Sequence, residues 1–326
     1  MANLIISRVC NIDCDYCFAR EALRPSPNSS ENYVAPDTFE TWLDFLDRSN
    51  IDEIRLLGGE PTHHPQFGLL LERSLERGKK ILLFSHGGFS EEILGLLESL
   101  PDERLRVMVN ISARSSRGNR LQKRRRITLK RLGSRVILGY TIAHTDLHLE
   151  SLLKLIDRFS LCRVIRLGLA QPVWEGSNTY LHPKQYPIIG RKIIEFGKMA
   201  KDMDIKIEFD CGFVPCMFSS QDREWLEQAF PNLGWHCNPV LDLNIDGRSF
   251  HCFPLAQKTF VYFQDGQKAD QIRAQMTESL RLYRIAGIYP ECSHCSLKAK
   301  GNCPGGCMSL TLCRYRETDL AIRCSV

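Results

Sequence analysis

The sequence has no stretch of about 18 consecutive apolar residues, so no segment is predicted to cross a membrane as a helix. A secretory signal peptide is not expected either, because a cysteine motif begins at residue 10 and cleavage would destroy it. No internal repeat is found. With 43% hydrophobic and 25% charged residues, the composition is that of a globular protein able to build a core.

The nine histidines show no metal-ligand spacing with one another, whereas the cysteines do. Fourteen cysteines in a secreted protein would suggest disulfides, but their spacing here suits metal ligation and predicts a reducing, cytoplasmic location. Cys162 stands apart and is interpreted as an isolated core thiol.

Three cysteines form a C-x3-C-x2-C motif directly after the first apolar run, at Cys10, Cys14 and Cys17. Three thiolates in one short loop can bind three irons of a four-iron cluster and leave the fourth iron open to a small molecule. A structural zinc site would need four ligands and a closed shell. The spacing therefore favours a catalytic cluster over a zinc knuckle.

A second motif, Gly58-Gly59-Glu60-Pro61, follows an apolar strand predicted over residues 54–57. Two glycines allow the backbone to approach a ligand closely, and a carboxylate can accept a hydrogen bond from an ammonium group. Alone this would be an ordinary turn. Placed some forty residues after the cysteine triplet, it supports a cofactor site.

Together the two motifs resemble those of the radical S-adenosylmethionine (SAM) superfamily. The resemblance implies that SAM chelates the open iron and that one electron splits it reductively to methionine and a 5′-deoxyadenosyl radical. This radical then abstracts hydrogen from the substrate. Tyr16 would lie beside the adenine, and Gly58, Gly59 and Glu60 would hold the methionine amine. Ser85 and Ser112, at strand ends, are further candidates for SAM contacts.

Residues 1–204 alternate between apolar strands and amphipathic helices. Strict alternation predicts parallel strands with right-handed crossovers, and the resemblance implies an α/β fold with a partial (β/α)6 TIM barrel. The predicted strands cover residues 4–6, 54–57, 81–84, 105–111, 136–142 and 164–170. Helices are predicted between them, and a further one near residues 183–203.

Residues 205–326 are predicted to form a second, smaller α+β domain that is rich in cysteine. A strand at 206–210 is followed by a hairpin, because Asp246-Gly247 is a two-residue turn signal between residues 240–245 and 248–253. A helix is expected near residues 271–285, and then a cysteine-rich tail.

The cysteines of this second domain resemble the SPASM extension found on many radical SAM enzymes. The pattern is Cys237-x9-Gly247-x4-Cys252, then Cys292-x2-Cys295-x7-Cys303-x3-Cys307, with Cys324 beyond. SPASM modules hold two auxiliary 4Fe–4S clusters, so SAM and three clusters are the expected cofactors. The resemblance implies one cluster on Cys237, Cys252, Cys307 and an upstream cysteine, for which Cys216 is favoured. The other would be held by Cys292, Cys295, Cys303 and Cys324.

Several cysteine assignments stay open at this point. Spacing alone does not decide between Cys211 and Cys216, or between Cys313 and Cys324. A zinc ribbon is the alternative for the tail, because C-x2-C pairs bind zinc as well. Cys211 ends an apolar alternation that aims it toward the barrel interior, where a thiol could donate a hydrogen atom to a substrate radical.

Ten Lys or Arg residues and no acid lie between Arg114 and Arg135. Such a run is usually a solvated helix face, but its density suggests an anionic partner. Aromatic residues for base stacking are absent from it. An anionic substrate near this run is therefore a hypothesis, with RNA among the candidates.

The resemblance favours the maturation of a ribosomally made peptide by crosslinking, epimerisation or oxidation. The expected partners are a separate leader-recognition protein, since no such domain precedes Cys10, and a low-potential electron donor such as flavodoxin or ferredoxin. The alternatives are a sugar or secondary-metabolite dehydrogenase or epimerase, an RNA-modifying enzyme, and a non-enzymatic iron–sulfur or zinc module. The oligomeric state is not predicted.

Overall fold

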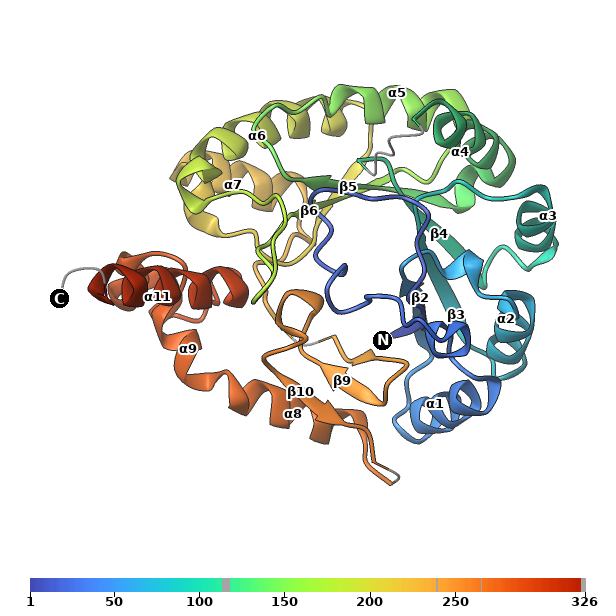
Figure 1. Cartoon of the computed structure of the whole chain (residues 1–326). Coiled ribbons are helices and arrows are strands. Elements are labelled where there is room, and N and C mark those ends of the chain that lie inside the picture. Colours follow the sequence, from blue (N-terminus) through green and yellow to red (C-terminus); the bar gives the residue numbers. More distant parts are fainter. Residues whose placement is uncertain (113–117, 239, 265, 324–326) are drawn as a thin grey trace.

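A computed structural model describes residues 1–112, 118–238, 240–264 and 266–323. Parallel strands ring a central space and helices cover their outer side (Figure 1). The parallel strands of the barrel are β1 (Ala2–Ser7), β2 (Glu53–Gly58), β3 (Lys80–Ser85), β4 (Leu105–Asn110), β5 (Val136–Ile142), β6 (Val164–Leu169) and β7 (Lys206–Phe209). The partial barrel predicted from sequence is confirmed.

Helices connect successive strands, and their apolar faces pack on the outside of the sheet. Phe39, Trp42 and Leu43 of the first helix are almost fully buried, as the 3.6-residue periodicity predicts. Ser90 caps the third helix by accepting a hydrogen bond from the Ile93 amide. The helices are α1 (Pro36–Arg48), α2 (Phe67–Glu76), α3 (Glu91–Ser99), α4 (Gly118–Leu132), α5 (Glu150–Phe159) and α6 (Tyr186–Asp202).

The predicted hairpin is present, as β8 (Asp242–Leu243) and β9 (Arg248–Phe250), but its turn is longer than expected. The Asn244 amide donates to the Arg248 carbonyl at 2.9 Å, so residues 245–247 form a three-residue turn. Gly247 takes φ 77°, the left-handed conformation that such a turn requires. The two-residue turn predicted from Asp246-Gly247 is corrected accordingly.

One sheet runs through the whole molecule, in the order β10-β9-β8-β1-β2-β3-β4-β5-β6-β7. Strand β8 adds in parallel to β1, and β10 (Phe260–Tyr262) completes the far edge. β6 precedes residue 204 and β7 follows it, and the two strands pair in parallel, so the sheet continues across this position. A division into two domains at that residue stays a prediction.

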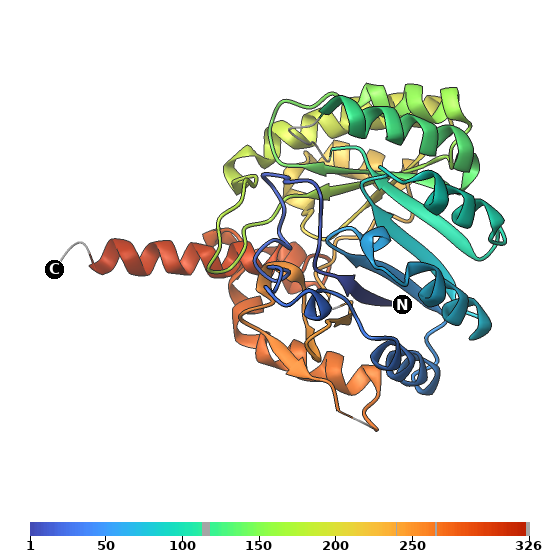
Figure 2. The same ribbon diagram turned by 45° about the vertical axis from the view of Figure 1, so that its right-hand side comes forward.

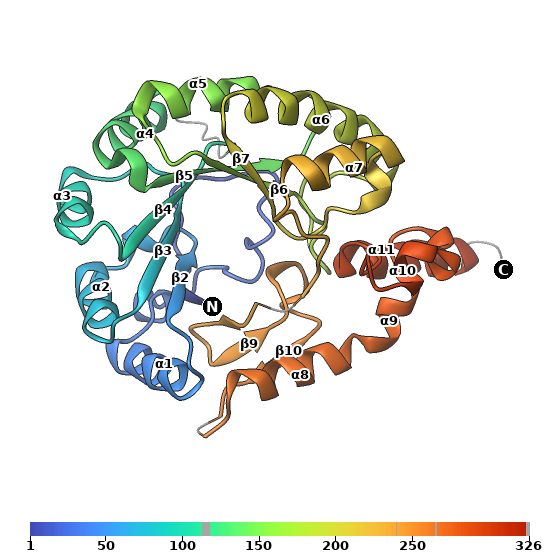
Figure 3. The same cartoon turned by 180° about the vertical axis from the view of Figure 1, so that it is seen from behind.

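The remaining helices follow or flank the hairpin, and Figure 3 shows α8 next to α1. Two contacts join them: the Ala269 amide donates to Ser49 Oγ at 3.1 Å, and the Phe45 and Phe263 rings meet edge to face. Helix α11 projects away from the rest of the chain (Figure 2). These helices are α7 (Ser220–Ala229), α8 (Ala269–Ser279), α9 (Arg281–Ala286), α10 (Ser296–Ala299) and α11 (Met308–Arg323). In the described residues, no helix combines the length and apolar character needed to cross a membrane.

Candidate functional site

The cysteine triplet lies in the loop after β1, at the carboxyl end of the parallel strands. Cys10 is exposed, and Cys14 and Cys17 are half-buried. The Cys17 amide donates to the Cys14 carbonyl at 3.1 Å, which bends the loop back on itself. The pKa of the Cys10 thiol is raised to about 12, chiefly because the surrounding chain partly shields the sulfur from water, with smaller contributions from the Glu60 carboxylate and the thiols of Cys14 and Cys17. The three cysteines therefore lie in one bent loop at the barrel mouth.

Gly58 and Gly59 hold the second motif against this loop. The Gly59 amide donates to the Ser7 carbonyl at 2.8 Å, and the Glu60 amide to that of Val9 at 2.7 Å. A Cβ atom would lie 2.1 Å from the Ser7 oxygen at Gly58, and 2.3 Å from the Val9 oxygen at Gly59. Only glycine permits this approach, which joins β2 to the start of the cysteine loop.

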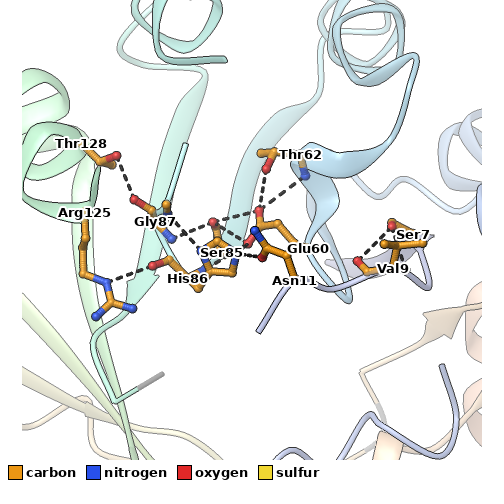
Figure 4. A network of polar contacts seen from close by, with 11 residues as sticks. Ser7, Val9, Asn11, Glu60, Thr62, Ser85, His86, Gly87, Arg125 and Thr128 are labelled. Atoms are coloured by element: carbon orange, nitrogen blue, oxygen red, sulfur yellow. Dashed lines mark hydrogen bonds and ion pairs between the residues drawn. The ribbon is translucent and has the colours of Figure 1, made fainter. Parts of the chain in front are cut away.

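The Glu60 carboxylate is buried at the centre of a polar network (Figure 4). Ser85 Oγ lies 2.9 Å from both carboxylate oxygens, and the His86 amide donates to one of them at 3.1 Å. Thr62 Oγ donates to the other at 2.8 Å. Ser85 thus contacts Glu60 and fixes the ends of β2 and β3 relative to each other.

His86 connects this network to the cysteine loop. Its Nδ1 accepts from the Gly88 amide at 3.0 Å, so Nε2 carries the proton. Nε2 lies 2.8 Å from Asn11 Oδ1 and 3.2 Å from Glu60 Oε2. Burial lowers the pKa of His86, which the Glu60 carboxylate partly opposes. The ring is a positioning group between the two motifs, a role that the sequence did not reveal.

Tyr16 and Ser112, both picked out from the sequence, meet in the structure at 3.0 Å between their hydroxyl oxygens. Ser112 donates to Asn110 Oδ1 at 2.6 Å and accepts from the Thr141 amide at 3.0 Å. The Tyr16 hydroxyl is therefore the donor to Ser112, and burial raises the pKa of Tyr16, which keeps the phenol protonated. Asn110 and Thr141 were missed, although both are polar residues at strand ends.

The cysteines of the C-terminal half form two groups. Cys237 and Cys307 are buried, Cys252 is half-buried, and burial raises the pKa of Cys252 together with the other two thiols. Cys211 is the neighbour of Gly212, where a Cβ atom would lie 3.9 Å from the Cβ of Cys307, and the thiols of Cys237, Cys307 and Cys252 all raise the pKa of Cys211. The sequence favoured Cys216 as the fourth member of this group, but the structure brings Cys211 there.

Cys216 lies in the second group instead. It lines one pocket with Cys292, Cys295 and Cys303, whose open space is about 300 Å³, part of it facing solvent. Burial raises the pKa of Cys216 to about 12, with these three thiols contributing. Cys324 lies outside the described residues. Cys313 lies on α11 and is half-buried.

The spacing of these thiols bears on the kind of metal group that they fit. Within the described ranges, no three His, Cys, Asp or Glu side chains converge closely enough to hold a single metal ion. A zinc ion draws its ligands to within about 2.3 Å of one point. A four-iron cube is bound at its corners, so its thiolates stand apart. Each group has four cysteines, the number of ligands that either a zinc ion or a four-iron cluster takes.

The basic run is divided between buried and exposed side chains. Arg125 is buried and its Nε donates to the His86 carbonyl at 3.0 Å, while Arg131 pairs with Glu98 and Glu91. Arg114 and Arg117 lie outside the described residues. The exposed cations of α4 are Arg120, Lys123, Arg126, Lys130 and Arg131.

Comparison with known families and curated proteins gives two matches. The family model for the radical SAM superfamily matches residues 4–164. An "S-adenosylmethionine-dependent nucleotide dehydratase" from Thermoplasmatales archaeon (strain ISO4-H5) is 29% identical over 102 residues. That match covers 31% of this chain and 34% of the curated protein, so the alignment spans about a third of its length.

Solved structures share the fold over most of the chain. SuiB of Streptococcus suis bound to S-adenosylmethionine has a TM-score of 0.66 at 15% identity, covering 94% of this chain and 72% of that one. The enzyme anSMEcpe with bound AdoMet has a TM-score of 0.67 at 16% identity, covering 94% and 88%. SuiB bound to precursor peptide SuiA matches with a TM-score of 0.58 at 13% identity, covering 85% and 63%. At these identities the likeness concerns the fold.

Proposed function

The chain belongs to the radical SAM superfamily through the match of residues 4–164, and we propose that Cys10, Cys14 and Cys17 bind its SAM-chelating 4Fe–4S cluster. The proposal is supported by the three thiols gathered in one loop at the barrel mouth. When bound, the cluster supplies the electron that cleaves SAM reductively and so generates the radical that takes hydrogen from the substrate. The non-enzymatic alternative is not retained, because the family is one of enzymes.

The chain's own residues bind and orient SAM in this proposal. Glu60 accepts from the methionine ammonium, because its carboxylate is already oriented by the hydroxyls of Thr62 and Ser85. Ser85 is a positioning residue, since its hydroxyl is engaged by Glu60 and by the Gly87 amide at 2.9 Å. Tyr16, fixed by its hydrogen bond to Ser112, supports the adenine.

The two C-terminal cysteine groups are proposed to hold auxiliary 4Fe–4S clusters. Their composition is revised relative to the sequence-based hypothesis: the first comprises Cys211, Cys237, Cys252 and Cys307. The second comprises Cys216, Cys292, Cys295 and Cys303, supported by their shared pocket. Cys324 is then not required as a ligand, and Cys211 is a ligand rather than a hydrogen donor.

The proposed substrate is a ribosomally made peptide. The fold likeness to SuiB, a protein whose complex with a precursor peptide is solved, supports this choice. A separate leader-recognition protein and a low-potential electron donor would complete the system.

The second candidate is a small anionic molecule such as a nucleotide. The curated relative named as a nucleotide dehydratase favours it, over the 102 residues that align. RNA remains a third candidate, for which the exposed cations of α4 are the supporting observation.

Anaerobic reconstitution tests the cluster assignment. We expect about twelve irons per chain and formation of 5′-deoxyadenosine on reduction with SAM. Replacing Cys10, Cys14 and Cys17 together with Ala should remove about a third of the iron and abolish 5′-deoxyadenosine, whereas Cys162→Ala should change neither. A wild-type protein that binds only zinc would contradict the proposal.

The substrate class is tested with that same enzyme. A peptide encoded beside the gene should change in mass when incubated with SAM and reductant. Turnover of a nucleoside triphosphate, with the peptide left unmodified, would establish the second candidate instead.

A further inference from the structure

Two arginines lie inside the barrel, on strands opposite each other. Arg55 is on β2, between Ile54 and Leu56, which are fully buried in the outer core against the helices. Strand alternation therefore turns Arg55 to the barrel interior. Arg166 of β6 reaches the same space, because the guanidinium carbons of both arginines lie 5.8 Å from the centre of the Phe84 ring.

The two guanidinium groups differ in how they are neutralised. Arg166 makes an ion pair of 2.9 Å with Asp210, at the end of β7. For Arg55, no hydrogen bond or ion pair is found among the described residues, and its Nε is shielded from solvent without a partner. Arg55 is only 9% exposed. A buried cation with no counter-ion is costly, and its presence points to a missing anion.

The other charged groups around Arg55 do not supply this anion. Asp242 of β8 is a buried acid that acts on Arg55, but Asn3 Nδ2 donates to its carboxylate and burial raises its pKa to about 7. Asp210 is engaged by Arg166 and also accepts from the Cys211 amide at 3.1 Å. Glu53 and Glu208 are exposed.

The position of the pair relates it to the candidate cluster sites. Phe84 packs against an apolar group that includes Ile5 and Leu57, and Cys17 and Phe18 of the cysteine loop pack against the same group. On the other side, Arg166 and Asp210 lead directly to Cys211. The arginines thus lie between the loop at the barrel mouth and the first C-terminal cysteine group.

We propose that Arg55, assisted by Arg166, binds an oxyanion of the substrate, a carboxylate or a phosphate, in the barrel interior. This inference rests on the proposed function, because it places the anion beside the site where SAM is cleaved. Arg55 offers free donors for the anion, and Arg166 can share its second edge while Asp210 holds the first. The Phe84 ring, whose centre lies 5.8 Å from each guanidinium carbon, attracts both cations.

The test is isothermal titration of the reconstituted, SAM-bound enzyme with two probes, inorganic pyrophosphate and an acidic pentapeptide. We expect one site per chain for the probe that resembles the substrate, and a loss of affinity of about tenfold or more in Arg55→Met. Arg55→Lys should lose less, because it keeps the charge without the planar fork. Arg163→Met, which removes an exposed arginine just before β6, is the matched control and should bind as wild type.

The two probes separate phosphate from carboxylate as the recognised group. Equal affinity in wild type and Arg55→Met at low salt would overturn the proposal. So would an Arg55→Met enzyme with unchanged anion affinity but a shifted cluster reduction potential, because Arg55 would then balance the charge of the C-terminal cluster. Iron content is measured on the same samples, so a failure of the cluster assignment is seen separately from a failure of anion binding.

Discussion

At the scale of single residues, the Glu60 carboxylate is both buried and surrounded by hydrogen-bond donors. Its carboxylate is buried, yet it accepts from Ser85, Thr62 and the His86 amide, so its charge is compensated by oriented donors. Such an acid is ready to receive an ammonium group without reorganising. The second motif is therefore held in one conformation, as the proposed SAM site requires, rather than being a flexible turn.

Glu60→Gln keeps the shape of the side chain and removes its charge. We expect SAM affinity to fall by about tenfold or more, because a hydrogen bond to a charged group contributes about 1.5–3 kcal/mol. Equilibrium binding of SAM to the reconstituted enzyme measures this. Glu72→Gln, on the exposed face of α2, should bind SAM normally. Unchanged affinity in Glu60→Gln would remove Glu60 from the SAM site.

The assignment of Cys216 is tested by comparing it with Cys324. Cys216→Ser should lose the iron of one cluster, about a third of the total, while Cys324→Ser should keep the full content. Iron analysis and electron paramagnetic resonance of the reduced proteins report this directly. Iron loss in both variants would restore the assignment implied by the resemblance, in which Cys216 and Cys324 bind different clusters. Iron loss in Cys324→Ser alone would remove Cys216 from both clusters.

His64 gives the protein a defined dependence on pH. Its Nδ1 accepts from the Gln66 amide at 3.0 Å while Nε2 lies 2.9 Å from the Val34 carbonyl, so the folded state holds the ring neutral. Burial lowers the pKa of His64 below its usual 6.5. Below that value the unfolded chain binds the proton first, and folding stability must fall as pH decreases from 6.5 toward the lowered pKa.

Urea unfolding between pH 7.5 and 6 measures this loss. In His64→Gln, the free energy of unfolding should fall less steeply as the pH decreases, because the contribution of this residue is gone. A variant with the same pH slope as wild type would show that His64 does not contribute.

At the scale of elements, the contact between the glycine motif and the cysteine loop sets the geometry of the barrel mouth. Gly59→Ala would place a methyl group 2.3 Å from the Val9 carbonyl oxygen, so the loop must move. We expect a lower melting temperature and loss of about a third of the iron. Gly95→Ala on α3 has nothing within 4 Å and should instead gain up to about 1 kcal/mol. Full iron content in Gly59→Ala would show that the loop tolerates displacement.

The basic residues of helix α4 have different roles, because Arg125 is buried and others are exposed. Arg125 donates to carbonyls of His86 and Ile111, at the ends of two strands. We expect Arg125→Met to destabilise the protein by about 1–3 kcal/mol in urea unfolding, because the buried His86 carbonyl and the partly buried Ile111 carbonyl each lose a donor.

Replacing the exposed cations of α4 tests whether this helix binds an anionic partner. The combined change of Arg120, Lys123, Arg126 and Lys130 to Gln should leave the free energy of unfolding nearly unchanged. If α4 docks an anionic partner, this variant binds substrate more weakly and with a flatter salt dependence. Unchanged binding at low salt would make the helix face simply solvated.

At the scale of the whole molecule, local sequence signals predicted most of the barrel, because its strands are apolar and its helices periodic. What they could not reveal was where β8 lies, since a strand of two residues, Asp242 and Leu243, has no periodicity. The grouping of Cys211 and Cys216 was equally out of reach. It depends on how the segment after β7 turns, which spacing does not encode. Arg55 was a missed signal: a single charge inside an apolar strand.

The contacts between the two halves predict how a truncated chain would behave. Removing residues 205–326 would uncover the edge of β1 that β8 pairs with, and would take Phe263 away from Phe45. We expect the fragment 1–204 to be unfolded or aggregated, because an exposed apolar strand edge promotes association. A monomeric fragment with a cooperative thermal transition would contradict this and support a domain division at residue 204.

The order of the strands in the sheet gives the first C-terminal cysteine group a structural role: it would connect the two margins of the sheet. Cys211 directly follows β7, at one margin of the sheet, while Cys252 comes just after β9, near the other. A cluster bound by both cysteines would link these two margins, which no strand-to-strand hydrogen bonds join among the described residues. Iron–sulfur bonds would then close the circumference of the barrel. The same chain made without iron would lack this closure, and its two sheet margins would be less firmly held together.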